Sequence, residues 1–291
     1  MAQIREIKKR MTAVKTIQRI TKTMQMIATA KFTAAVGRAK ATKPYTENIR
    51  RLVSEVVAAA GDVDHPLITG PIASEGANRE LLLVITSDRG LCGAYNGNVL
   101  RRAVTHLNQL RSKGVECDLE TSGKKAVAYF RFLRYTLAQR HTVGDKPKYE
   151  DVERLADRYI QEFLAGRYSA VRVAYMRFES NARQTPQVVQ LLPLQAEQVA
   201  AAEGAGGSYE FSPSSVDLLD DLLPRAVKTT LFQAFNDAVV SEQIMRMVAM
   251  KAATENAKDI GKTLRRDFNR ARQTQITTEL TEIIAGSAAL E

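Results

Sequence analysis

The chain of 291 residues has no tryptophan, two cysteines and no apolar run that approaches the roughly 20 residues needed to span a bilayer. The scarcity of cysteine excludes a disulfide framework, so we expect Cys92 and Cys117 to be buried thiols in a reducing compartment. No signal-peptide core follows Met1, and a soluble or peripheral protein is expected. The 45% of apolar residues suffice for a core in one or two domains.

Positive charge is in excess and is concentrated at the start of the chain. Lys and Arg outnumber Asp and Glu by 42 to 32, which gives a formal net charge of +10 and favours an anionic partner. Residues 1 to 51 hold most of the imbalance. A solvated helix face is one interpretation, but unbalanced like charges at helical spacing repel one another, and an acidic surface nearby would relieve that repulsion. The basic residues there are Arg5, Lys8, Lys9, Arg10, Lys15, Arg19, Lys22, Lys31, Arg38, Lys40, Lys43, Arg50 and Arg51, against Glu6 and Glu47.

The last part of the chain predicts one very long helix. After Pro213 only Pro224 interrupts it, and no glycine occurs before Gly261, so the helix would exceed about 100 Å. A helix of that length cannot be buried in one core. Its apolar stripe is thin and rich in Ala and Thr, which predicts a single long partner helix at close approach. The stripe comprises Leu219, Leu223, Ala226, Thr230, Ala234, Ala238, Met245, Val248, Ala252, Ile260, Leu264, Phe268 and Ala271.

The predicted partner is a second amphipathic helix over residues 2 to about 58. No Gly or Pro occurs between Met1 and Gly37, and the helix is expected to resume after Pro44 and Tyr45 and to end near Gly61. Residues 61 to 79 are expected to form a loop. The apolar stripe of this helix is Ile4, Ile7, Met11, Val14, Ile17, Ile20, Met24 and Ile27.

The middle of the chain alternates predicted strands and helices. Strands are expected at 81–86, 115–119, 170–178 and 188–194, and helices at 94–110, 124–133 and 149–164. Such alternation predicts a small α/β layer domain between the two long helices, with a parallel or mixed sheet. Residues 195 to 212 are small and glycine-rich and predict a link to the last helix.

A glycine-containing turn follows the first strand of this domain, from Ser87 to Gly93. Strand, glycine turn and helix is the layout of a nucleotide-binding crossover. However, the G-x-G-x-x-G order is absent and no Walker lysine follows. The alternative is a structural turn in which Asp88 and Arg89 bond to backbone groups and the small Gly93 permits close packing. His65, His106 and His141 have no neighbours in sequence that suggest a triad or metal set.

The final turns are poor in large apolar groups but carry Arg272, Gln273, Thr277 and Glu279 within two turns. Such a helix tip offers hydrogen bonds around its circumference, which suits a tip held in a collar. The alternative is a frayed, solvated terminus.

Three segments resemble the signature regions of the F-type ATP synthase gamma subunit family. They are ITKTMQMIATAKF at 20–32, TSDRGLCGAYN at 86–96, and RMVAMKAATENA with NRARQTQITTELTEI between residues 246 and 283. They occur in the family's order, and the resemblance covers essentially the whole chain.

The resemblance implies an α/β fold with long helices: an antiparallel coiled coil of the N- and C-terminal helices (1–60 and 210–291) plus an inserted Rossmann-like α/β domain (78–195), with flexible connections at 61–77 and 196–209. It also implies a non-catalytic rotor shaft inside a hexamer of alternating alpha and beta subunits, with the α/β domain near the epsilon subunit and the membrane ring of c subunits. Rotation of that ring by protons would drive the catalytic beta subunits through their conformations. No cofactor, metal, nucleotide or nucleic acid is expected to bind this chain. The protein is expected at the cytoplasmic face of a bacterial plasma membrane, with membrane contact only through the complex.

Family roles map onto individual positions. Lys22 and Met24 match the neck that passes the acidic lever loops of beta, although Thr23 and Gln25 stand where many relatives have Ala and Glu. No cysteine-bearing insert like that of chloroplast gamma subunits occurs near residue 200, so thiol regulation is not expected. Arg272, Gln273, Thr277 and Glu279 match residues that hydrogen-bond to beta. Lys40, Pro44, Tyr45, Tyr209 and Glu210 match contacts with epsilon and the c-ring, and Ser87, Asp88, Arg89, Gly90 and Gly93 match a mid-domain motif of structural role.

Two other classes of function remain open from the residues alone. The basic excess in residues 1 to 51 is also compatible with a coiled-coil arm that binds nucleic acid with strong salt dependence. An enzyme built on the α/β domain would bind nucleotide at the turn 88–93.

Overall fold

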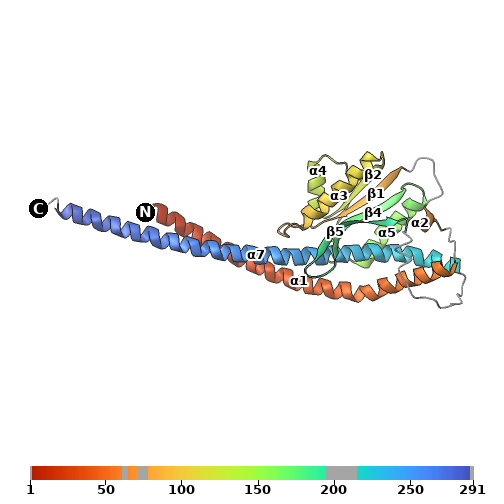
Figure 1. Ribbon diagram of the computed structural model, residues 1–291, viewed down its shortest axis with the longest axis horizontal. Coiled ribbons are helices and arrows are strands. Elements are labelled where there is room, and N and C mark those ends of the chain that lie inside the picture. Colours follow the sequence, from red (N-terminus) through yellow and green to blue (C-terminus); the bar gives the residue numbers. More distant parts are fainter. Residues whose placement is uncertain (1, 61–64, 71–77, 195–214, 289–291) are drawn as a thin grey trace. The chain divides into compact units, whose positions relative to one another are not determined.

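The computed structural model describes residues 2–60, 65–70, 78–194 and 215–288. The chain divides into two compact units, residues 1–30 with 246–291, and residues 31–245. Two long helices, α1 (Ala2–Ala60) and α7 (Ser215–Ala288), contribute to both units (Figure 1). The predicted division into a shaft and a separate α/β domain, with its boundaries at 60, 78, 195 and 210, stays a prediction.

Both long helices are confirmed, with 59 residues in α1 and 74 in α7. The interruption expected at Pro44 is wrong, because α1 continues through this residue. A proline inside a helix costs about 3 kcal/mol, since it removes one hydrogen bond and crowds the preceding turn. Burial of Thr46, Ile49 and Val53 just beyond Pro44 holds the following turns in place and offsets this cost. Helix α7 likewise contains Pro224.

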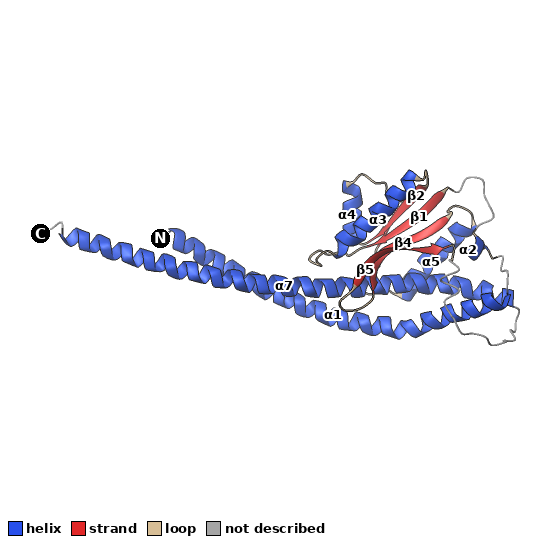
Figure 2. Cartoon of the chain, in the orientation of Figure 1, coloured by secondary structure: helices blue, strands red, loops and turns tan. Residues whose placement is uncertain are grey.

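The unit 31–245 contains a five-stranded mixed sheet in the order β3-β2-β1-β4-β5 (Figure 2). The first four strands in this order run parallel, and β5 is antiparallel to β4. The strands are β1 (Arg79–Ile85), β2 (Glu116–Ser122), β3 (Gln139–His141), β4 (Ala170–Phe178) and β5 (Gln184–Leu192). The helices between them are α3 (Tyr95–Ser112), α4 (Lys124–Phe132) and α5 (Tyr149–Leu164).

Strand β1 is the centre of this unit because its two faces serve two different cores. Leu81, Leu83 and Ile85 pack with α5, with α1 near Val53 and with α7 from Leu219 to Ala238. Leu82 and Val84 point to the other face and pack with α3 and α4. Successive side chains of a strand point to opposite faces, so a strand buried on both sides is apolar throughout, as the run LLLVI is.

Two short elements were not expected. Strand β3 has three residues, Gln139–His141, and none of them carries the apolar alternation that marks a strand. The region 61–79, expected to be a loop, contains the single-turn helix α2 (Pro66–Thr69). Pro66 stands at its first position, and the Nδ1 atom of His65 accepts a hydrogen bond from Leu67 N at 3.1 Å as an N-cap.

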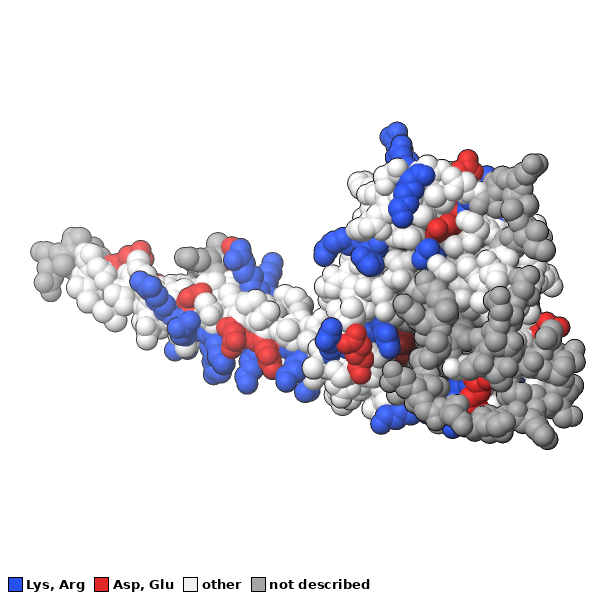
Figure 3. Space-filling model, turned by 45° about the vertical axis from the view of Figure 1, so that its right-hand side comes forward, with Lys and Arg blue, Asp and Glu red and all other residues white. Residues whose placement is uncertain are grey.

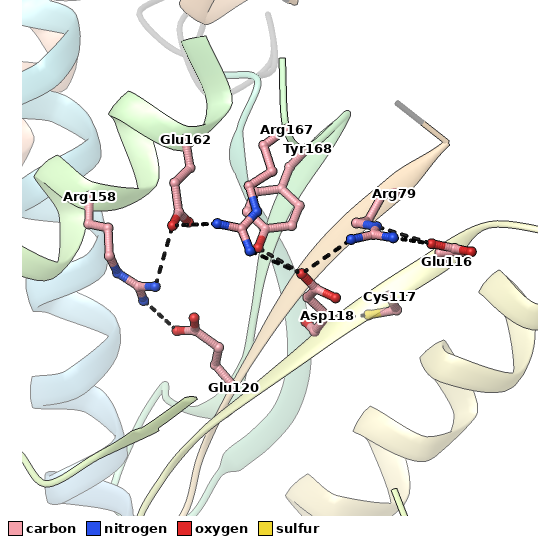
Figure 4. A network of polar contacts seen from close by, with 9 residues as sticks. All are labelled: Arg79, Glu116, Cys117, Asp118, Glu120, Arg158, Glu162, Arg167 and Tyr168. Atoms are coloured by element: carbon pink, nitrogen blue, oxygen red, sulfur yellow. Dashed lines mark hydrogen bonds and ion pairs between the residues drawn. The ribbon is translucent and has the colours of Figure 1, made fainter. Parts of the chain in front are cut away.

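A network of charged groups joins α5 and the turn after it to β1 and β2 on one face of the sheet (Figure 4). Its most buried member is Glu120, whose side chain is 2% exposed. Its Oε2 atom lies 2.7 Å from His141 Nε2 and accepts hydrogen bonds from Arg158 at 2.6 Å and from the Tyr159 hydroxyl at 2.7 Å. These contacts tie the edge strand β3 and helix α5 to β2. The labelled charged members are Arg79, Glu116, Asp118, Glu120, Arg158, Glu162 and Arg167.

The same contacts control the ionisation of Glu120. Burial by itself would raise the pKa of this carboxyl, but hydrogen bonds from His141, Arg158 and Tyr159 outweigh it and lower the pKa from 4.5 to about 2. A carboxylate with a lowered folded-state pKa stabilises the fold above the unfolded-state pKa. That contribution is lost as pH falls towards the folded-state value.

We therefore predict that Glu120→Gln lowers the free energy of unfolding at pH 7 by about 3 kcal/mol, because Arg158 loses its buried partner. The wild-type protein should lose a similar amount between about pH 4.5 and pH 2, and the variant should lack this component. Urea unfolding followed by circular dichroism across that range measures both. Glu116→Gln is the control: this side chain is 70% exposed, so the loss should stay below about 1 kcal/mol. Equal losses in the two variants would show that the buried contacts of Glu120 stabilise the fold no more than the exposed ones of Glu116.

Candidate functional site

Within the unit formed by residues 1–30 and 246–291, the two helices run antiparallel. Thr254 Oγ1 donates a hydrogen bond to Thr21 Oγ1 at 2.8 Å, and Gly261 faces Val14. From Val14 to Thr21 the number on α1 rises by seven, while from Gly261 to Thr254 the number on α7 falls by seven. This confirms the predicted antiparallel pairing of the chain's two ends.

The contact seam follows a strict heptad spacing of alternating steps of three and four residues on both helices, the pattern of a coiled coil. Several seam positions are polar, among them Gln18, Thr21, Gln25 and Thr254, so polar side chains interrupt the apolar seam. On α1 it comprises Ile4, Ile7, Met11, Val14, Gln18, Thr21, Gln25 and Ala28, and on α7 Met250, Thr254, Ala257, Gly261, Leu264, Phe268, Ala271 and Gln275, all buried or half-buried.

Several large apolar residues that were predicted to lie in the contact between the two helices lie outside it. Ile17, Ile20, Ile27, Val248 and Ile260 are each between 51% and 57% exposed. The expected stripe followed the large apolar residues, whereas the heptad register continues through Gln and Thr. Ten of the sixteen exposed large apolar side chains in the described chain belong to this two-helix unit, so it presents apolar groups outward as well as to its own seam.

The tip of α7 extends beyond its partner. In this register Ala271 lies opposite Ile4, so residues after about 275 have no α1 segment to pair with, and α7 projects beyond the N-terminus (Figure 1). Arg272, Gln273, Thr277 and Glu279 are all exposed there. Thr277 donates to Gln273 O at 3.0 Å, and Glu279 accepts from Gln275 Nε2 at 2.7 Å. Exposed apolar residues accompany them: Ile276, Leu280, Ile283 and Ile284.

Positive charge lines a groove of about 620 Å³ between the two helices. Lys and Arg side chains follow the visible face of the helical pair (Figure 3). Among the groove residues Glu255 is the one acidic group, and no basic residue of the groove forms an ion pair or side-chain hydrogen bond within the described residues. The basic residues are Lys15, Arg19, Lys22, Lys251 and Lys258. Lys22 was predicted as a site residue, whereas Lys251 and Lys258 were missed because their stretch of sequence carries a balanced charge.

The other predicted contact residues lie apart from this groove. Met24 is half-buried on α1. Lys40, Pro44 and Tyr45 are exposed in the unit 31–245, with 50% of Tyr45 accessible. The predicted contacts Tyr209 and Glu210 lie outside the described residues. The roles of all these residues stay predictions.

The turn from Ser87 to Gly93 connects β1, α3 and α4 through hydrogen bonds. Ser87 N donates to Asn96 Oδ1 at 3.0 Å, and Asp88 Oδ1 accepts from Lys124 N at 3.0 Å. The predicted bonding of Asp88 to backbone is confirmed. Arg89 takes part through its carbonyl, which accepts from Ser87 Oγ at 2.6 Å. The role of Asn96 was not anticipated.

The close packing expected at Gly93 occurs instead at Gly123, another glycine at this edge of the sheet. Gly93 is exposed with φ of 59°, so it supplies a left-handed backbone rather than close packing. Gly123 provides the close approach, since a Cβ there would lie 2.1 Å from Thr86 O. The cavity beside the turn, lined by Thr86, Asp88 and Gly123 among others, measures about 20 Å³. It has room for about one water molecule and is far too small for a nucleotide.

Each of the three histidines lies beside a carboxylate. His65 lies 3.1 Å from Asp220, His106 lies 3.5 Å from Glu80, and His141 lies against Glu120. The described residues contain no group of three or more metal-ligating side chains. Cys92 is buried and Cys117 half-buried, and both are free thiols. Burial raises the pKa of Cys117 to about 12, which keeps its thiol protonated and unreactive. Across the described part of the chain, no helix is both long and apolar enough to cross a membrane.

The chain combines a unit of two paired helices with a unit built on a five-stranded sheet. Comparison with known proteins identifies its family. The family model described as ATP synthase matches residues 3–290. The ATP synthase gamma chain of Rhodopirellula baltica is 41% identical over 298 residues, and that of Leptospira biflexa is 36% identical over 291, each alignment covering 100% of both chains.

The fold agrees with this assignment. A chain in the structure of the Euglena gracilis mitochondrial ATP synthase aligns with a TM-score of 0.67 at 19% identity, covering 99% of this chain and 95% of that one. The chain belongs to the ATP synthase gamma chain family, and the resemblance in its sequence is confirmed. It is therefore a non-catalytic subunit of a membrane-associated ATP synthase complex.

The seam geometry predicts the effect of substituting Gly261. A Cβ there would meet Val14 Cγ1 at 3.9 Å, an ordinary contact distance. Gly261→Ala should raise the free energy of unfolding by about 0.5–1 kcal/mol, because alanine restricts the unfolded chain and favours the helix. Gly261→Leu should instead destabilise the pair by forcing the helices apart. Urea unfolding of the purified chain distinguishes the two; a loss of stability with alanine would show that the backbones approach more closely than described.

Proposed function

We propose that this chain is the central rotor shaft of a proton-translocating ATP synthase and couples rotation of the c-ring to conformational change in the catalytic beta subunits. The observation that carries the proposal is the outward-facing apolar surface of the two-helix unit. A pair of helices that exposes Ile17, Ile20 and Ile260 while its seam holds Gln and Thr has its remaining apolar surface available for a surrounding protein.

The surrounding protein is an alternating hexamer of alpha and beta subunits, as family membership leads us to expect. The acidic loops of these subunits would face the cationic groove, in which Lys15, Arg19 and Lys22 form no ion pair with any described residue of this chain. Charge complementarity of this kind fixes register and steers partners. Exposed ion pairs contribute only about 0–1 kcal/mol each, so successive beta subunits can exchange them as the shaft turns.

The tip of α7 is the proposed site of torque transfer. Arg272, Gln273, Thr277 and Glu279 would hydrogen-bond to beta subunits, and the neighbouring Ile276 and Leu280 would lie against an apolar collar. Arg272 has no partner within the described residues and is available for a carboxylate in a charge-assisted bond. Met24 and Lys22 would make the corresponding contacts at the neck.

The unit 31–245 would contact the subunits that rotate together with this chain. Lys40, Pro44 and Tyr45 are exposed on α1 and are proposed, with Tyr209 and Glu210, to contact epsilon and the c-ring. The chain itself would not touch lipid. It would lie at the cytoplasmic face of a bacterial plasma membrane as a peripheral component.

Removal of the chain from a reconstituted complex tests the function. Vesicles that contain the complete ATP synthase should make ATP in response to a proton gradient, and vesicles prepared without this chain should make none. Restoration of synthesis by adding the purified chain during assembly is the matched control. Unchanged proton-driven synthesis without the chain would refute the proposal.

A sharper prediction concerns the tip. Arg272→Ala with Gln273→Ala should reduce proton-driven ATP synthesis by about tenfold or more, the scale of one lost charge-assisted hydrogen bond, while the subunit composition of the complex stays normal. Gln139→Ala with Arg140→Ala removes the same two residue types from an exposed part of the sheet unit and should have little effect. Failure of assembly together with normal activity in the complexes that do form would contradict the assigned role.

A further inference from the structure

A pocket of about 320 Å³ lies between α3 and the sheet in the unit 31–245. Helix α3 contributes Arg102, His106 and Gln109 to it, and Lys113, the C-cap residue that follows the helix, also lines it. These residues are separated by four, three and four positions, so they share one face of the helix. The pocket therefore has a continuous polar wall, which the rotor function does not use.

The floor of the pocket is a carboxylate whose charge is already matched. Glu80 is 12% exposed, and its Oε2 atom accepts a hydrogen bond from Arg172 Nε at 2.8 Å. His106 Nε2 lies 3.5 Å from the same atom. Burial raises the pKa of Glu80, but the His106 and Arg172 side chains outweigh burial, so the net shift is downward and the group stays ionised. Arg172 thus balances the one negative charge in the pocket.

The rim of the pocket carries positive charges that are not paired with acidic groups among the described residues. Arg102 and Lys113 are exposed, and neither side chain forms an ion pair or hydrogen bond within the described residues. Nε2 of His106 is buried beside Glu80 Oε2, at 3.5 Å, without well-aligned hydrogen-bond geometry. Two free cations and a buried ring nitrogen thus converge on one cavity.

The remaining wall is apolar. Leu110 and Val115 come from the end of α3 and the turn after it, and Val188 comes from β5. A site with an apolar wall and a few convergent polar groups is the usual form of a small-molecule pocket, although this one is at the lower limit of the usual volume range of about 300–1,000 Å³.

We propose that this pocket binds a small organic oxyanion, a phosphate or carboxylate attached to a compact apolar body. Arg102 and Lys113 hold the oxyanion, since a guanidinium group matches its oxygens in a bidentate manner and the ammonium group adds a second charge. His106 provides a further polar contact, and the body of the ligand packs on Leu110 and Val188. All these residues belong to the sheet unit, so the proposal does not depend on the contacts made by the helical pair.

The test is titration calorimetry of the purified full-length chain with phenyl phosphate. We expect saturable binding at one site, weakened at least about tenfold in Arg102→Gln with Lys113→Gln, the scale of one lost charge-assisted hydrogen bond. Benzoate, titrated in parallel, distinguishes the two sources of the oxyanion. Tighter binding of phenyl phosphate assigns an organic phosphate, and tighter binding of benzoate assigns a carboxylate.

The matched control is Arg101→Gln with Arg111→Gln, which removes two exposed cations from the same helix outside the pocket and should change the affinity less than about twofold, the scale of non-specific attraction. A second variant, Gln109→Trp, fills the pocket without removing charge and should abolish binding. The proposal is overturned if neither probe binds, if the control weakens binding as much as the pocket variant, or if Gln109→Trp binds normally. Equally tight binding of inorganic phosphate and phenyl phosphate would also overturn the proposal, because the apolar wall would then contribute nothing to the affinity.

Discussion

The packing of one thin seam between two very long helices constrains the rest of this molecule. A seam in which Gln18, Thr21 and Thr254 alternate with apolar residues buries only part of the apolar surface of the two helices, so the pair is held by a narrow heptad contact rather than by a large core. The apolar residues outside the seam can then be buried only by another protein. The narrow contact between the two helices and their need for a partner protein therefore both follow from how the apolar residues are distributed between the seam and the outer surface.

In the sheet unit, by contrast, the apolar residues are buried within the unit itself. Strand β1 is fully enclosed, with Leu81 and Leu83 on one side and Leu82 and Val84 on the other. Helix α7 from Leu219 to Ala238 belongs to one of these cores. The first half of α7 is thus anchored by dense packing, while its last turns stand without a helix beside them. The same helix is a core element at one end and an exposed contact surface at the other.

Sequence patterns predicted the elements better than the contacts. Strand β4 and helix α5 were predicted to the residue, because Val, Tyr and Phe alternate in one and recur at helical spacing in the other. Ile17, Ile20 and Val248 were assigned to the seam in error, since apolar character alone does not distinguish a residue that faces a partner helix from one that faces a partner subunit. Strand β3 was missed because its residues, Gln139 to His141, pair through the backbone and through Glu120. The close approach at Gly123 depends on Thr86, 37 positions away, which no local pattern reveals.

Helix α7 has a mechanical consequence that follows from its continuity. The helix runs without interruption from Ser215 to Ala288, lacking only the backbone hydrogen bond that Pro224 cannot donate, and its residues belong to both compact units. A twisting load applied to the anchored half is therefore carried along the helix by stiff covalent and hydrogen-bonded geometry, without any loop to absorb it. Gly261 is the residue of the paired segment with the least resistance to bending, and elastic deformation should concentrate there.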